Sequence, residues 1–174
     1  MNIGRTYVHS KVRDVIINAY ADLQKSNPGK IFVYGETGLE HGGKFSPHKT
    51  HQNGLSVDFM VPVLNRKNQS VALPTHALNR FGYDIEFNQQ GVYKALRIDF
   101  EAIGAHLVAL HQQAKQHGVG IWRVLFAPDL QPKLYQTRYG HYLRQHIRIA
   151  KRKSWVRHDD HYHVDFDVAC LPML

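Results

Sequence analysis

Hydrophobic and polar residues follow a helical period in two long segments of the chain. In residues 8–26 and 98–117, apolar side chains recur at steps of three and four, the spacing that places them on one face of a helix. An Asn-Pro-Gly sequence follows the first segment and a glycine follows the second, and both signals end helices. Both segments are therefore predicted to be helices. His106, His111 and His117 lie in the second and are predicted to be solvated or to cap its end.

Shorter apolar runs, rich in β-branched and aromatic residues, predict strands between and after these helices. They lie at residues 30–34, 55–61, 120–127 and 161–168. A further short helix is predicted over residues 134–144. Residues 65–90 mix turn-forming and apolar residues, and we expect loops that flank a cleft. This order predicts an α+β fold: a small, mainly antiparallel sheet with helices packed on one face and a cleft on the other.

Composition places the chain among globular proteins. A chain of 174 residues, 43% of them hydrophobic, can bury a sizeable core in one domain, which is predicted to span residues 1–174. Cys170 is the only cysteine, which excludes an intramolecular disulfide and a closed zinc site built from cysteine pairs. No apolar run approaches the roughly 18 residues of a membrane helix, so no transmembrane segment is expected. The polar first ten residues do not resemble a signal peptide.

The formal charge of +8 favours polyanionic partners. Nucleic acid is one such partner, and cell-wall polymers with free carboxylates and phosphodiesters are another. Basic residues are concentrated between residues 144 and 157. This run is interpreted either as a solvated face or as an electrostatic platform for an anionic polymer. Nothing in the sequence predicts the oligomeric state.

Two short stretches concentrate side chains that bind metals. His51 and Asp58 lie across a short loop from each other, and Asp58 stands between two apolar residues, where an unpaired carboxylate would be costly to bury. His161 and His163 are two residues apart, so in a strand they point to the same face. Two histidines, one aspartate and an open fourth position form the catalytic zinc pattern. The spacing alone leaves open which of His161 and His163 would bind the metal.

These two stretches resemble the LAS group of zinc peptidases (lysostaphin-type, D-Ala-D-Ala-type and related enzymes). Within that group they are most similar to the penicillin-insensitive, MepA-like murein endopeptidases. The matching positions are Gly42-Gly43, Pro47-His48, Thr50-His51-Gln52, Gly54-Leu55, Val57-Asp58 and Asp160-His161-Tyr162-His163-Val164. The resemblance implies a single zinc ion in the predicted cleft, held by His51, Asp58 and His163.

The resemblance also implies roles for the residues around the metal. His161 would lie beside the water at the metal, as general base or as a donor to the oxyanion. His48 and His158 would line the site and help to position substrate. Asp160 lies where D-Ala-D-Ala-type relatives carry a catalytic Glu, so it is a rival candidate for the base. Ser56 stands where an Asp is expected, which puts any role of that carboxylate in doubt.

The implied substrate is a peptide crosslink of bacterial peptidoglycan, most simply the D-alanyl-diaminopimelate bond, with no specific nucleic-acid partner. A periplasmic or secreted location follows from that substrate. A metal-dependent nuclease or phosphoesterase is an alternative, suggested by the charge and the His/Asp cluster, although such enzymes typically carry further carboxylates for a second metal. A catalytically silent, zinc-bearing wall-binding module is the other alternative. It would be expected to lack a catalytic residue, yet every matched position is present.

Overall fold

The computed structural model of the chain describes residues 4–44, 46, 48, 50–152 and 156–169. Its helices are α1 (Ser10–Ser26), the short 3-10 helix η1 (Ala77–Gly82), α2 (Phe100–Gln116), α3 (Gln131–Tyr135) and α4 (Gly140–His146). Its strands are β1 (Val33–Tyr34), β2 (Ser56–Met60), β3 (Val63–Leu64), β4 (Ser70–Val71), β5 (Val92–Tyr93), β6 (Leu96–Ile98), β7 (Gly120–Leu125) and β8 (His161–Asp167). No helix in the described ranges is long and apolar enough to cross a membrane.

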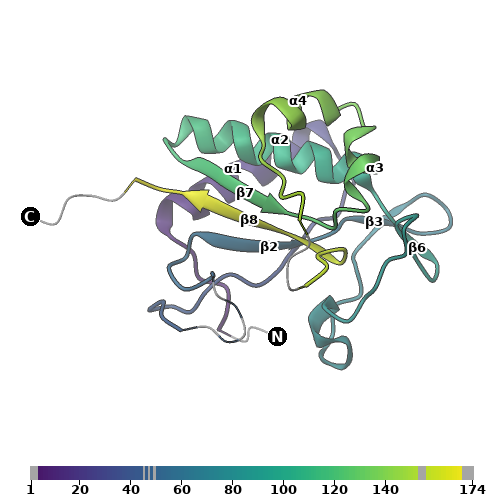
Figure 1. Cartoon of the computed structure of the whole chain (residues 1–174), viewed down its shortest axis with the longest axis horizontal. Coiled ribbons are helices and arrows are strands. Elements are labelled where there is room, and N and C mark those ends of the chain that lie inside the picture. Colours follow the sequence, from purple (N-terminus) through teal and green to yellow (C-terminus); the bar gives the residue numbers. More distant parts are fainter. Residues whose placement is uncertain (1–3, 45, 47, 49, 153–155, 170–174) are drawn as a thin grey trace, which may run out of the picture.

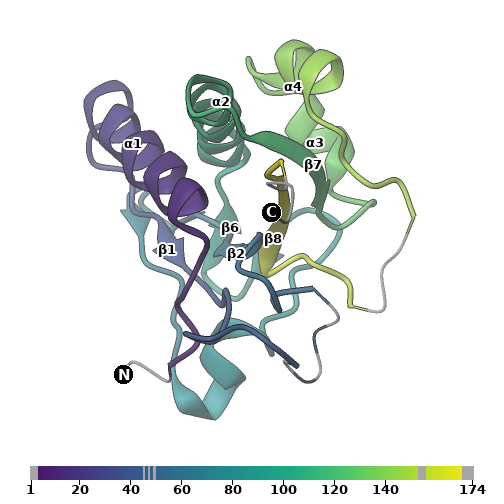
Figure 2. The ribbon, with the colours of Figure 1, turned by 90° about the vertical axis from the view of Figure 1, so that its left-hand side faces the viewer.

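The strands form two antiparallel sheets, which we call the site sheet and the second sheet. The site sheet has the order β1-β2-β8-β7, and the second sheet has the order β4-β3-β6-β5. Helices α1 and α2 pack side by side over one face of the site sheet, as Figures 1 and 2 show. The opposite face carries the side chains of the candidate metal centre. The predicted α+β fold, with helices on one face, is thereby confirmed.

Strand β8 lies in the interior of the site sheet, between β2 and β7, and its seven residues alternate between the two faces. Its even-numbered side chains belong to the hydrophobic core: Tyr162, Val164 and Phe166. Its odd-numbered side chains make polar contacts on the other face: His161, His163 and Asp165. One strand therefore contributes both to the core and to the polar cluster, which explains why nearly all of it is buried.

The helix predicted over residues 134–144 is instead two short helices, α3 and α4, separated by a turn. Gly140 begins α4 so close to the end of α3 that an added Cβ would lie 2.0 Å from the carbonyl oxygen of Tyr135. The turn therefore depends on the missing side chain at Gly140. The predicted continuous helix was wrong because this close approach of backbone leaves no trace in the hydrophobic period.

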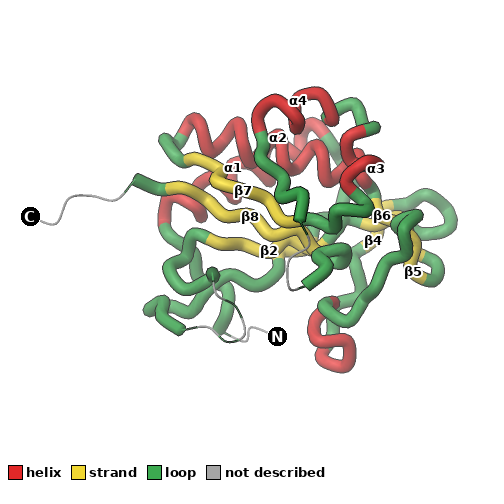
Figure 3. Tube along the Cα trace, viewed as in Figure 1, coloured by secondary structure: helices red, strands yellow, loops and turns green. Residues whose placement is uncertain are grey.

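The second sheet was not predicted. Its strands are two or three residues long, too short to show an alternating pattern (Figure 3). Only β4 lies within residues 65–90, the segment that was expected to form loops, and the other three strands flank it. Helix η1 follows β4 and contains Arg80 and Phe81 in the left-handed backbone region, with φ of 48° and 59°. Tyr83 follows this helix, and its hydroxyl forms a hydrogen bond with Asp58 of β2.

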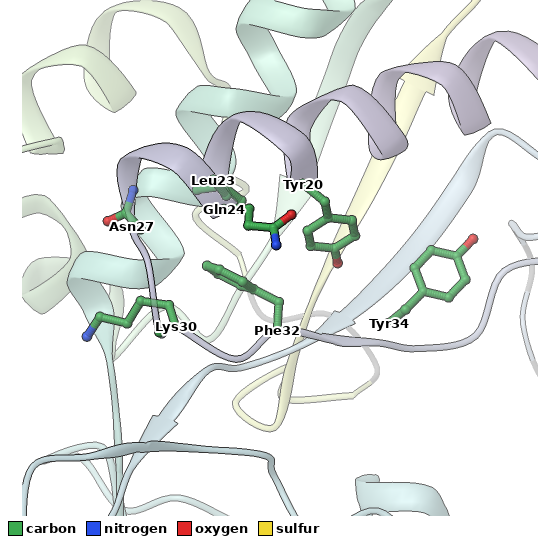
Figure 4. Close-up of a pocket in the computed structure, with 8 residues that line it drawn as sticks. Tyr20, Leu23, Gln24, Asn27, Lys30, Phe32 and Tyr34 are labelled. Carbon is green, nitrogen blue, oxygen red and sulfur yellow. The ribbon is translucent and has the colours of Figure 1, made fainter.

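His106 is completely buried, with 0% of its surface exposed, so its predicted solvation was wrong. Its ring stacks on Tyr20 at 5.0 Å between centroids and meets Phe59 edge-on at 4.7 Å. Its Nδ1 forms a hydrogen bond with the hydroxyl of Tyr162. Figure 4 shows Tyr20 and Phe32 at the wall of a neighbouring pocket of about 400 Å³, beneath α1. Helix α2 is thus covered by other elements on the side that carries His106.

The basic segment between residues 144 and 157 is described except for residues 153–155. Within it, Arg157 does not belong to a solvated face. Its guanidinium forms ion pairs of 2.7 Å with Asp129 and with the buried Asp159. Arg157 therefore links the chain just before β8 to the connection between β7 and α3, where Asp129 lies.

Candidate metal centre

Three side chains bring one donor atom each to a common point on the helix-free face of the site sheet. Asp58 on β2 and His163 on β8 are register partners, and His51 comes from the loop between β1 and β2. Asp58 Oδ1 lies 2.8 Å from His163 Nδ1 and 3.4 Å from His51 Nε2, and the two nitrogens are 3.1 Å apart. Ligand atoms around one tetrahedral zinc lie about 3.3 Å from each other, because each bond is roughly 2.0–2.1 Å. The spacing of the triplet therefore fits a single tetrahedral metal ion.

Hydrogen bonds on the far side of each imidazole orient the two histidines. His51 Nδ1 lies 2.6 Å from the carbonyl oxygen of Thr37, an acceptor that requires a proton on this nitrogen. His163 Nε2 lies 2.7 Å from Asp165 Oδ1. Each ring thereby directs its other nitrogen toward Asp58. His51 also has a left-handed backbone, with φ of 45°, a strained conformation of the kind found at functional sites.

A second group of donors includes His48. Atoms of His48, His51 and Asp58 all lie within 4.8 Å of one another, so these residues too can be grouped as metal ligands. That spread is wider than in the triplet with His163, and His48 Nε2 already lies 2.9 Å from a carboxylate oxygen of Glu36. The triplet of His51, Asp58 and His163 fits one ion better, with His48 beside it, edge-on to His51 at 4.8 Å between ring centroids.

His161 lies next to the triplet without entering it. Its Nε2 is 3.8 Å from Asp58 Oδ2, and its Nδ1 lies 3.1 Å from Asp160 Oδ2. Tyr83 packs against it, with the two rings 4.9 Å apart, and the Tyr83 hydroxyl donates a 2.8 Å hydrogen bond to Asp58 Oδ2. Sequence reasoning missed Tyr83, because it lies in the segment whose short elements carry no readable pattern.

Charges in the centre compensate for burial. Burial alone would raise the pKa of Asp58, but His161, His163 and His51 outweigh it and hold the pKa well below its usual value. Burial alone would lower the pKa of His163, but hydrogen bonds to Asp165 and Asp58 raise it to about 9. Near pH 7 and without metal, His163 is therefore the charged imidazolium, with a proton on both ring nitrogens. A metal ion has to displace one of these protons, since ligation requires the neutral imidazole.

The loop before β8 supplies the last of the predicted residues. His158 lies 4.7 Å from His161 between ring centroids, and its backbone is left-handed, with φ of 59°. Burial lowers its pKa to about 4, so it is neutral near pH 7. Asp159 anchors this loop: it accepts a hydrogen bond of 2.5 Å from the amide of Phe87 and pairs with Arg157. The structure thus gathers His48, His51, Asp58, His158, Asp160, His161 and His163 in one cluster.

The family comparison agrees with this geometry. The family model described as penicillin-insensitive murein endopeptidase matches residues 1–171. The chain belongs to the penicillin-insensitive murein endopeptidase family. Membership makes it a metallopeptidase and a peptidoglycan hydrolase, and it indicates a cell-envelope location. The resemblance of the two histidine stretches is thereby confirmed and extends over nearly the whole chain. No curated protein matches the chain.

Proposed function

We propose that this murein endopeptidase hydrolyses peptide crosslinks of peptidoglycan with one zinc ion held by His51, Asp58 and His163. The observation that carries the proposal is the convergence of three buried donor atoms at mutual distances of 2.8–3.4 Å. Membership of a peptidase family favours peptides over phosphodiesters as substrates. When bound, zinc lowers the pKa of a coordinated water to about 7 and polarises a carbonyl group.

We assign proton transfer to His161. Asp160 is placed to accept a hydrogen bond from its Nδ1, which leaves Nε2 directed toward Asp58, 3.8 Å from Oδ2. His161 Nε2 is therefore placed to take a proton from the attacking water and to pass it to the departing amine. Asp160, whose carboxylate is engaged with His161, orients the imidazole in this scheme and is not itself the base. General acid–base help of this kind contributes about 10²–10⁴ in rate.

We assign substrate positioning to His48 and His158. His48 is partly exposed at one side of the triplet, and its contact with Glu36 fixes its ring. His158 donates through Nδ1 to the carbonyl oxygen of Val156, at 2.8 Å, so its Nε2 is free of the proton and able to accept a hydrogen bond from a substrate amide. The simplest substrate bond is the D-alanyl-diaminopimelate amide.

The test is mass spectrometry of the fragments released from purified peptidoglycan sacculi that contain diaminopimelate. Zinc-loaded protein is compared with the His51→Ala variant, prepared in the same way. Conversion of crosslinked dimers into monomers by the unaltered protein alone is the expected result, and the fragment masses identify the bond that is cut. Stoichiometric zinc binding without any change in the fragments would refute the substrate while leaving the metal centre in place.

A further inference from the structure

Asp165 is the centre of a three-strand polar arrangement behind His163. Its Oδ1 accepts hydrogen bonds from His163 Nε2 at 2.7 Å and from the hydroxyl of Ser56 at 2.6 Å. Its Oδ2 accepts from Arg123 Nε at 2.6 Å. The carboxylate is buried, so these three donors replace the water that would otherwise solvate it.

The sheet register explains how these partners meet. Ser56 on β2 and Arg123 on β7 are both cross-strand partners of Asp165 on β8. The pairing of β7 with β8 is irregular between Ile121 and Arg123, and irregularities of this kind re-aim side chains. Arg123 also lies against the ring of the exposed Trp122, at 4.3 Å from its centroid. Three strands therefore converge on a single carboxylate.

We infer that Asp165 is a positioning residue: it holds His163 with a proton on Nε2 and so presents Nδ1 to the metal. This inference rests on the zinc centre of the proposed function. It also accounts for Ser56, which stands where the family resemblance leads one to expect an Asp. In this chain the carboxylate belongs to Asp165, the cross-strand partner of Ser56, and the Ser56 hydroxyl donates a hydrogen bond to it.

The physical effect has two parts. A carboxylate that accepts from the far nitrogen of a metal-binding histidine fixes the tautomer and the ring orientation. It also makes the ligating nitrogen more basic, which strengthens the bond to a cation. Asp165→Asn keeps the shape and one acceptor oxygen but removes the charge, and it leaves Arg123 without its carboxylate. Loss of such a partner typically weakens metal binding by about 10- to 100-fold.

The first test measures zinc affinity directly, by competition of the metal-free protein with a fluorescent chelator. We expect Asp165→Asn to bind zinc about 10- to 100-fold more weakly than the unaltered protein. Ser56→Ala should produce a smaller loss, since one hydrogen bond to Asp165 remains on each oxygen. Asp167→Asn, an exposed carboxylate at the end of the same strand, is the matched control and should bind zinc normally. Equal affinity of Asp165→Asn and this control would overturn the inference.

The second test requires no variant, so it remains decisive if Asp165→Asn fails to fold. Nitrogen-15 NMR of the imidazole rings in the zinc-loaded protein reports which nitrogen of His163 is metallated and which is protonated. The expected result is metal at Nδ1 and a slowly exchanging proton at Nε2. Metal at Nε2 would overturn the inference. Neither measurement uses peptidoglycan, so a protein that binds zinc in this way but leaves sacculi intact would refute only the proposed substrate.

Discussion

The burial of His106 predicts that the fold becomes less stable in acid, for a reason that lies in the hydrophobic core and not in the metal centre. Its ring is sealed between Tyr20, Phe59 and Tyr162, and burial lowers its pKa from the ordinary 6.5 to about 3. The folded protein therefore holds His106 neutral at every pH above about 4, whereas the unfolded chain protonates it below about 6.5. Between these values the unfolded state binds more protons, so the contribution of His106 to stability is complete above pH 6.5 and is lost as the pH falls.

The size of the effect follows from the difference between the two states. At about pH 4.5 the unfolded histidine is two units below its pKa, and each unit corresponds to about 1.4 kcal/mol, so protonation favours unfolding by about 3 kcal/mol. The value hardly depends on the folded pKa, because pH 4.5 lies well above about 3. A loss of this size is a large share of the roughly 5–15 kcal/mol that stabilises an ordinary domain.

The assay is urea unfolding of metal-free protein at about pH 7.5 and about pH 4.5, with metal absent so that zinc release adds no pH dependence. His106→Asn cannot titrate in this range and can still form a hydrogen bond with Tyr162. Between the two pH values the unaltered protein should lose about 3 kcal/mol more stability than His106→Asn. His141→Asn, an exposed histidine on α4, is the control and should behave as the unaltered protein. Equal losses for all three proteins would refute the reasoning.

Three further predictions concern the centre and the helices. His163→Ala should lose zinc and endopeptidase activity together, whereas His161→Ala should keep stoichiometric zinc and lose about 10²–10⁴ in rate, as metal analysis and fragment release will show. Tyr83→Phe removes the hydroxyl that orients the ligand carboxylate, and chelator competition should show zinc binding about 10-fold weaker. Gly104→Ala should destabilise the fold by about 1–3 kcal/mol in urea unfolding, because the new Cβ would lie 2.8 Å from the Tyr139 ring; unchanged or greater stability would contradict this packing.

The sequence was most informative where one pattern carries both structure and chemistry. Alternation along β8 placed His161 and His163 on one face, and the neighbouring apolar residues of Asp58 indicated a buried carboxylate in a strand. The period of α2 showed one apolar face, but it could not show that other elements also cover the side that bears His106. The position of Tyr83 beside Asp58 could not be predicted from the sequence. The segment around it consists of very short strands and a left-handed turn, and neither produces a hydrophobic period.

The hydrogen-bond partners of the proposed metal-binding residues could not be predicted for a related reason. The resemblance made Ser56 conspicuous as a missing carboxylate, but the replacement lies on another strand, 109 residues away in sequence. Only the register of β2 with β8 shows that Asp165 is opposite Ser56. Arg157 is a similar case. It lies in a run of basic residues, and nothing in that run indicates that Arg157 forms ion pairs with Asp129 and Asp159.

The alternation of β8 also bears on how this protein tolerates insertions and deletions. A slip of one residue in the pairing of β8 would turn its histidines into the core and its apolar side chains toward the substrate face. The same error that destroys the metal centre would then bury two imidazoles and a carboxylate among the helices, at a cost in stability that an ordinary domain cannot meet. Molecules with a misaligned β8 would therefore be expected to unfold and not to persist as folded, inactive protein. The pairing register of β8 and the geometry of the proposed metal ligands are therefore kept or lost together.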